Sequence, residues 1–158
     1  MATPNPTLIQ ALRDTATQLK NGATYAWGNH GSCNCGNLVQ VVCHLPKAEI
    51  LQYAHQGIGE WTELATEYCG VTNAPISMVM HKLQAIGLTP SDIHNLEYLD
   101  NRKVLELLPN GFQWLQKNNK EHVILYFETF ATMLEDALLQ SINITELFTI
   151  STPELVVA

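Results

Sequence analysis

The chain has 158 residues, with 8 Lys and Arg against 15 Asp and Glu, a formal net charge of −7, 46% apolar residues and 15% charged residues. This length and composition fit one compact domain over residues 1–158 and exclude a disordered chain. Nonspecific nucleic-acid binding needs clustered Lys and Arg, which an acidic chain with few of them lacks. No apolar run reaches the roughly 18 residues that span a bilayer, and residues 1–12 lack the pattern of a secretory signal. We therefore expect a cytoplasmic protein that binds neither nucleic acid nor membrane.

In the first half of the chain, apolar residues recur every three or four positions, which is the spacing of one helix face. The segments with this spacing are 8–19, 35–45, 50–57 and 61–68. Asn21-Gly22 is a typical helix end after the first segment, and Pro46 stops the second. The pattern predicts four consecutive helices.

The second half continues in the same way. Pro75 suits the first position of a helix that runs to Gly87. The run Thr89-Pro90-Ser91-Asp92 is typical of a capping box, and helical spacing continues from there to the turn at Pro109-Asn110-Gly111. A short aromatic segment over 112–115 precedes a long final helix over 123–138. Residues 142–158 fit either a helix or a strand and form a possible peripheral tail, so we expect an all-α single-domain bundle of about seven to eight helices.

The final helix is apolar over a broad arc. The residues of this arc are Val123, Ile124, Phe127, Phe130, Ala131 and Leu134. A helix face this wide is either deeply buried or shared with another subunit. A homodimer is therefore one possible partner arrangement, beside an unidentified small molecule or protein.

One segment carries the residue types of a chemical site. Between Asn29 and Gly36, directly before a predicted helix, lie one histidine and two cysteines. Imidazole and thiolate are the ligands that zinc prefers, and a tetrahedral site needs four of them. The first hypothesis is a zinc site formed by His30, Cys33 and Cys35, with Cys69 or His55 as the fourth ligand.

The second hypothesis is a nucleophilic thiol. The positive end of a helix dipole favours thiolate, and His30 could act as its base. The run Gly31-Ser32-Cys33-Asn34-Cys35 resembles the loop before the catalytic helix of papain-like proteases, and residues 34–40 resemble the cysteine-bearing helix start of NlpC/P60 peptidases. These resemblances cover about ten residues and imply a hydrolase or transferase with Cys35 as nucleophile and Asn29 at an oxyanion hole. The downstream histidine of these families begins a strand, whereas His122 lies before a segment that fits a helix.

The third hypothesis gives the cysteines no chemistry. Free cysteine is among the most buried residue types, and a helical core can hold four of them as small apolar side chains. Asn29 and Asn34 then cap a loop and a helix. In this interpretation the chain is a helical interaction module without a catalytic site.

Overall fold

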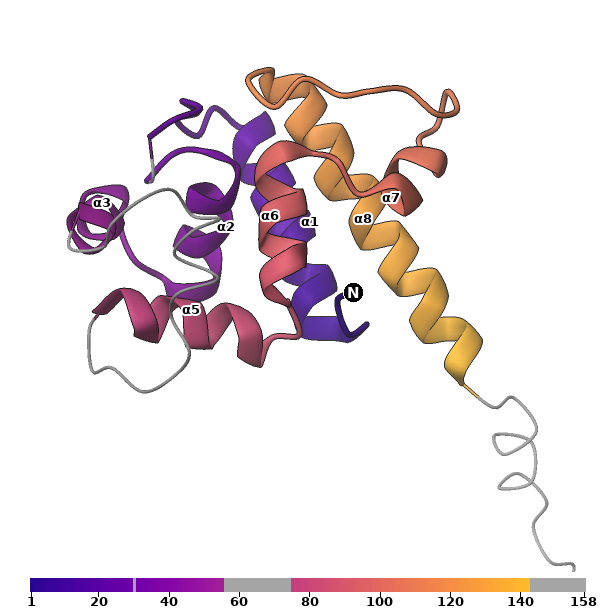
Figure 1. Ribbon diagram of the computed structural model, residues 1–158, viewed down its shortest axis with the longest axis horizontal. Helices are drawn as coiled ribbons and strands as arrows, with labels where there is room; N and C mark the ends of the chain where they lie inside the picture. The colour runs from indigo at the N-terminus through magenta and orange to yellow at the C-terminus, as the bar shows by residue number, and fades with distance from the viewer. Residues whose placement is uncertain (30, 56–74, 143–158) are drawn as a thin grey trace, which may run out of the picture.

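The computed structural model describes residues 1–29, 31–55 and 75–142, and within these ranges the chain forms seven helices and no strand (Figure 1). The helices are α1 (Pro6–Lys20), α2 (Asn34–Cys43), α3 (Lys47–His55), α5 (Pro75–Ala85), α6 (Pro90–Tyr98), α7 (Arg102–Glu106) and α8 (Lys120–Ser141). The all-α prediction is confirmed. The helix predicted over 61–68 and the tail from residue 143 onward lie outside the described residues.

Local capping signals placed several helix ends correctly. The α1 helix ends at Asn21, and Gly22 follows it with φ of +97°, a left-handed conformation that glycine adopts readily. At the start of α6 the Thr89 hydroxyl accepts the Asp92 N–H at 3.2 Å, and the Asp92 carboxylate accepts the Thr89 N–H at 2.8 Å. This reciprocal pair is the predicted capping box.

The helical spacing over residues 93–108 belongs to two helices rather than one. Leu99 takes φ of +55°, which ends α6, and the Asn101 side chain accepts the Lys103 N–H at 3.0 Å to start α7. The Leu99 side chain is nevertheless 1% exposed. Leu99 therefore packs its side chain in the core while its backbone takes a left-handed conformation that leucine rarely adopts.

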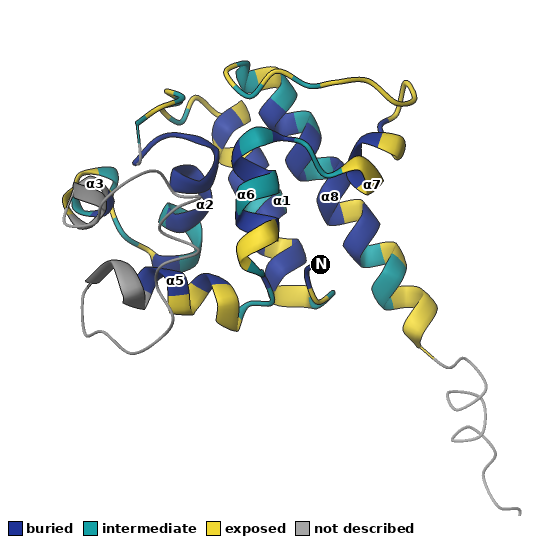
Figure 2. Ribbon diagram, in the orientation of Figure 1, coloured by how far each residue is buried: buried dark blue, intermediate teal, exposed yellow. Residues whose placement is uncertain are grey.

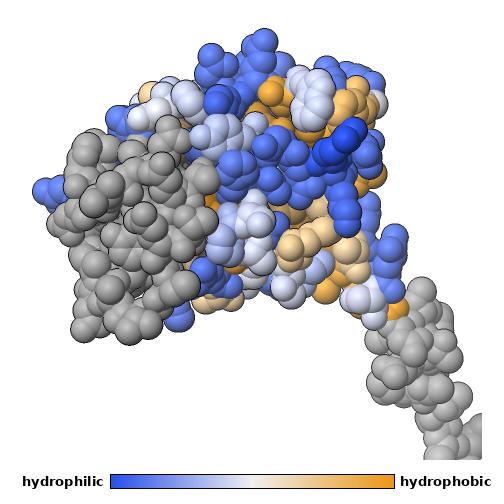
Figure 3. All heavy atoms as spheres, viewed as in Figure 1, coloured by the Kyte–Doolittle hydropathy of each residue, from blue (hydrophilic) through white to orange (hydrophobic). Residues whose placement is uncertain are grey.

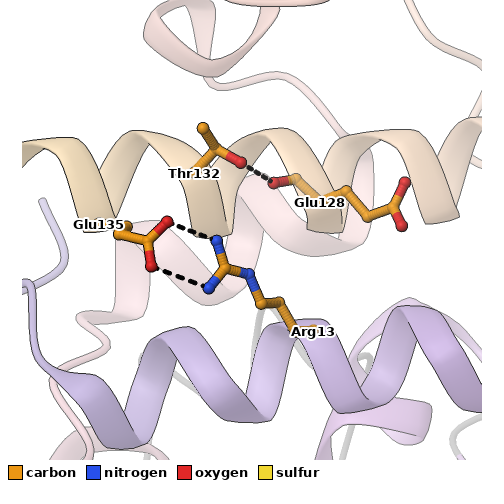
Figure 4. Close-up of polar contacts among 4 residues, drawn as sticks. All are labelled: Arg13, Glu128, Thr132 and Glu135. Atoms are coloured by element: carbon orange, nitrogen blue, oxygen red, sulfur yellow. Dashed lines mark hydrogen bonds and ion pairs between the residues drawn. The ribbon is translucent and has the colours of Figure 1, made fainter.

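The helices α1 and α8 pack along each other, and the buried faces of the bundle turn inward (Figure 2). Thr15 and Leu12 of α1 are fully buried, as is Phe127 of α8. At the edge of this contact, Arg13 donates two hydrogen bonds to the Glu135 carboxylate, at 3.0 and 2.6 Å (Figure 4). The same view shows the Thr132 hydroxyl donating to the Glu128 carbonyl within α8.

The apolar arc of α8 is covered within a single chain. All six residues of the arc are at most 4% exposed. The α8 face thus has its partner in the bundle itself, and the homodimer stays a prediction that this face no longer requires.

The helix α2 occupies a central place, because it packs against α1, α3, α5 and α6. Its first residues carry the cysteines, so the candidate site lies inside the bundle and not at its rim. Among the residues the structure describes, no helix is both long and apolar enough to cross a membrane.

Candidate functional site

The loop before α2 is a series of tight turns that Asn29 organises. Its side-chain Oδ1 accepts the Gly31 N–H and the Ser32 hydroxyl, both at 3.1 Å. Its backbone carbonyl accepts the Ser32 and Cys33 N–H groups at 2.9 and 2.7 Å. A side chain at Gly31 would meet the Lys47 carbonyl at 2.7 Å, so only glycine fits there. Asn29 therefore holds the loop in shape, as the third hypothesis expected.

Cys33 is the N-cap of α2. Its sulfur accepts the Gly36 N–H at 3.4 Å, in the position where a serine or aspartate oxygen usually sits. The expectation that Asn34 caps this helix was wrong, because Asn34 is already its first residue. Cys35 follows one position later, and its sulfur lies 3.4 Å from the Ile93 carbonyl of α6.

Asn34 joins the start of α2 to the end of α6. Its amide nitrogen donates to the Leu96 and Glu97 carbonyls at 3.2 and 2.8 Å, and its oxygen lies 2.9 Å from the Tyr25 hydroxyl. The last four carbonyls of a helix have no partner within the helix, and Asn34 supplies one for two of them. Since Asn34 is fully buried, this link is part of the core.

Glu97 completes the cluster. This side chain is 5% exposed, and its Oε2 accepts the Cys35 N–H at 3.1 Å. The carboxylate also hydrogen-bonds with the thiols of Cys33 and Cys35. A carboxylate at a helix N-terminus is favoured by the helix dipole, so Glu97 occupies the place where the sequence suggested a thiolate.

The electrostatics of the cluster keep both thiols protonated. Burial, and then the negative charge of Glu97, raise the pKa of Cys33 and Cys35 well above the ordinary value of a thiol. The side chains of Cys33 and Cys35 are 2% and 1% exposed. Nucleophilic attack and metal ligation both need the thiolate, and this environment opposes it. The expected ease of ionisation at the helix start is offset by the carboxylate placed there.

The predicted site residues are only partly brought together. Cys33 and Cys35 converge on Glu97, whereas His30, His55 and Cys69 have side chains or positions outside the described part of the chain. Within the described ranges, no three or more His, Cys, Asp and Glu side chains form a group that could hold a metal ion. The zinc hypothesis thus rests on ligands that the structure does not describe, and it stays a prediction.

His122 lies on helix α8, as its sequence context indicated, and not on a strand. Its ring Nδ1 accepts the Gln116 N–H at 2.9 Å. The histidine therefore fixes the loop before α8, and its contact there is structural.

Sequence reasoning missed the role of Glu97 at this site, although one signal was present. Within α6, Ile93 and Leu96 lie on the buried stripe, and Glu97 follows Ile93 by four positions on the same face. A carboxylate on the apolar side of a helix is costly to bury without partners, so it marks a polar contact in the core. The partners themselves lie more than sixty positions away and have no local sequence signal.

A different surface is exposed and apolar. Leu107, Phe112 and Trp114 are 56%, 43% and 65% exposed. The rings of Phe112 and Trp114 meet edge to face with centroids 5.2 Å apart, and the Arg102 guanidinium lies 5.8 Å from the Phe112 centroid. We call Arg102, Lys103, Leu107, Phe112 and Trp114 the aromatic face. In the space-filling view, hydrophobic and hydrophilic atoms adjoin at the upper right, where α7 and the following segment lie (Figure 3).

Comparisons of this chain with models of protein families, with curated proteins and with solved structures found no match.

Proposed function

We propose that this protein is a non-catalytic helical interaction module, and that its aromatic face binds an acidic, partly apolar segment of a partner protein. The observation that carries the proposal is the exposure of Leu107, Phe112 and Trp114 in one stretch of the chain. Exposed tryptophan beside arginine is typical of the residues that contribute most to binding at protein interfaces.

The aromatic face is held in position before any partner arrives. Val104 and Leu105 anchor α7 in the core, and the Gly111 N–H donates to the Leu108 carbonyl at 2.9 Å. The edge-to-face contact further restrains the two rings. A surface that is already ordered loses less conformational entropy on binding, which favours recognition.

Charge supports an acidic partner. Four of the eight Lys and Arg residues of the chain fall within residues 102–120, and this stretch contains one acidic residue, Glu106. The stretch is thus positive in a protein whose net charge is −7. Opposite charge on the partner raises the association rate and selects its orientation.

The same charges do not favour nucleic acid. Lys117 lies between two aromatic rings, and the Lys120 ammonium donates to the Ala23 carbonyl at 3.3 Å. Arg102 lies over the Phe112 ring and the Lys103 ammonium lies 3.6 Å from the Met1 sulfur, so the aromatic face itself carries two cations, fewer than a phosphate backbone usually engages.

The two other hypotheses concern the cysteine loop, which is the segment from Asn29 to Gly36, and the structure gives them weaker support there. A thiol hydrolase needs an accessible thiolate, and the Cys35 thiol is buried with a raised pKa. A zinc site remains a second proposal, because Cys33 and Cys35 both lie beside Glu97, while His30 and Cys69 fall outside the described residues. Zinc would have to displace two thiol protons there, and metal analysis of the protein purified without a chelator tests it.

The experiment for the interaction module is a titration with a synthetic amphipathic peptide that carries glutamate on one helix face and leucine and phenylalanine on the other. We expect chemical-shift changes at the Trp114 indole N–H, and a loss of affinity of about tenfold or more in Trp114→Ser. Leu139→Ser is the matched control, since Leu139 is 59% exposed and lies on α8 outside the aromatic face.

The charge component has its own control. A peptide with glutamine in place of glutamate should bind more weakly, and Arg102→Ala should reduce the difference between the two peptides. Lys82→Ala, an exposed change on α5, should leave the difference intact. Equal binding to Trp114→Ser and Leu139→Ser, or equal binding of the two peptides, would contradict the proposal.

A further inference from the structure

A separate groove lies beside the start of α2 and the end of α6. It has a volume of about 560 Å³, and its walls include Trp27, Tyr98, Asp100 and Lys117. Trp27 comes from the loop before α2, Tyr98 is the last residue of α6, and Lys117 belongs to the segment before α8. Trp27, Tyr98 and Asp100 have no role in the proposed function, and Lys117 enters it only through the charge of the stretch 102–120.

The groove already holds one cation. The Lys117 ammonium lies 4.3 Å from the centroid of the Trp27 ring and 4.2 Å from that of the Tyr98 ring. Two π faces that approach a single positive charge from different elements form an aromatic cage for cations. The cage therefore favours a positive charge, and the ammonium group of this chain's own Lys117 occupies it.

Within the described part of the chain, the Lys117 side chain is the group that lies between the two rings and has to leave for the cage to open. Its backbone carbonyl accepts a hydrogen bond from the Tyr25 hydroxyl, which fixes the main chain at this point. The lysine stem is flexible, and its ammonium is strongly hydrated in water. Lys117 can therefore move into solvent at small cost while the walls of the groove stay in place.

Two residues that line the groove, Trp27 and Asp100, each carry a buried polar atom for which the described residues supply no hydrogen bond. Among the described residues, the Trp27 indole Nε1 and the Asp100 Oδ1 are the buried side-chain nitrogen and oxygen atoms without a hydrogen bond. The other oxygen of Asp100 lies 3.7 Å from His94 Nε2. A buried polar atom without a partner is costly, so these two point to a ligand with one acceptor and one donor.

We propose that this groove binds a methylated ammonium group, which displaces Lys117 from between Trp27 and Tyr98. A quaternary ammonium ion is less hydrated than the lysine ammonium and loses less on entering the cage, so it can replace Lys117. Asp100 adds a negative charge to the groove, and the net charge of −7 attracts cations to the protein.

The test is a titration of the full chain with choline, followed by the Trp27 indole N–H signal in two-dimensional NMR. Trp27→Phe identifies this signal among the three tryptophans. The matched control ligand is 3,3-dimethyl-1-butanol, which has the shape of choline and no charge. We expect choline to shift the signal and the alcohol to leave it unchanged.

Variants distinguish a loss of the cage from a loss of the fold. Lys117→Ala removes the internal competitor and should tighten choline binding about two- to fivefold. Tyr98→Leu in the Lys117→Ala background should abolish binding, while Lys82→Ala, an exposed change on α5, should change nothing. Trp114→Ser should bind choline like the wild type, so a failure of this proposal is distinguishable from a failure of the aromatic face.

Two sources could supply the methylated ammonium. A short peptide with trimethyllysine, compared with the same peptide carrying unmodified lysine, represents a modified protein, and choline represents a free metabolite. The ligand with the lower dissociation constant, the trimethyllysine peptide or choline, identifies the source. The proposal is overturned if neither shifts the Trp27 signal in well-folded Lys117→Ala, if the uncharged alcohol acts like choline, or if Lys117→Ala weakens binding.

Discussion

The cysteine loop and the aromatic face differ in how completely the fold satisfies their side chains. At the cysteine loop, Asn29 and Asn34 find hydrogen-bond partners inside the bundle, as does Glu97, which reaches the loop from α6. The thiols are buried beside them. On the aromatic face, Trp114 leaves 65% of its surface in water. The residues with the most reactive chemistry are thus used for structure, and those with the least reactive chemistry are free to bind. Both proposals therefore rest on exposure and unmet contacts more than on residue type.

The largest effect is expected where the loop is most deeply part of the core. In Asn34→Ala, the Leu96 and Glu97 carbonyls lose a buried donor, and each unsatisfied group costs about 1–3 kcal/mol. We expect a loss of about 3 kcal/mol in the free energy of unfolding, measured by urea denaturation.

The matched control is Gln18→Ala, an exposed change on α1. It should alter the free energy of unfolding by less than about 0.5 kcal/mol. If Asn34→Ala is as stable as this control, the loop is not a structural part of the core.

A second effect concerns the thiols. Glu97→Gln keeps an oxygen to accept the Cys35 N–H but removes the charge that raises the pKa of both cysteines. The pKa values should fall, and alkylation of Cys33 and Cys35 at pH 8 should become about tenfold faster. Peptide mapping by mass spectrometry after iodoacetamide treatment measures each rate.

Glu106→Gln removes an exposed carboxylate from α7 and should leave both alkylation rates unchanged. If Glu97→Gln also leaves them unchanged, Glu97 does not control the ionisation of the thiols.

A smaller effect is expected at the α1–α8 edge. Arg13 lowers the pKa of Glu135 by hydrogen bonding and charge. A lowered carboxyl pKa contributes stability above the pKa of the unfolded chain, and this contribution disappears as the pH falls through the folded value. The wild type should therefore melt at a slightly higher temperature than Arg13→Ala at pH 7, and the gap should close at a second pH below the folded pKa of Glu135.

Gln18→Ala on the same helix should show no pH-dependent difference of this kind, because Gln18 is a neutral, exposed side chain. A gap between wild type and Arg13→Ala that is equally wide at both pH values would show that the ion pair contributes nothing.

Sequence patterns predicted the parts of this fold that local interactions decide. The Asn21-Gly22 helix end and the Thr89 capping box each depend on residues within four positions, and both were confirmed. The division at Leu99 was not predicted, because core packing sets it and leucine has no local preference for a positive φ.

The candidate site shows the same difference between local and long-range interactions. The pattern located the loop at the start of α2, but it could not show that Glu97 reaches the helix N-terminus from α6. Burial of the thiols, and then the charge of Glu97 at this long-range contact, reverse the expected ionisation of the thiols. Similarly, the aromatic segment over 112–115 was visible in the sequence, whereas its exposure is a property of the folded chain.

Native mass spectrometry of the untagged protein, purified in mild reductant without a chelator, tests the comparison most directly. If the cysteine loop is structural, the mass is that of the bare chain with every thiol protonated. A stoichiometric zinc adduct that has displaced two protons, and that is lost in Cys33→Ser and Cys35→Ser, would make the loop a metal site and contradict the account.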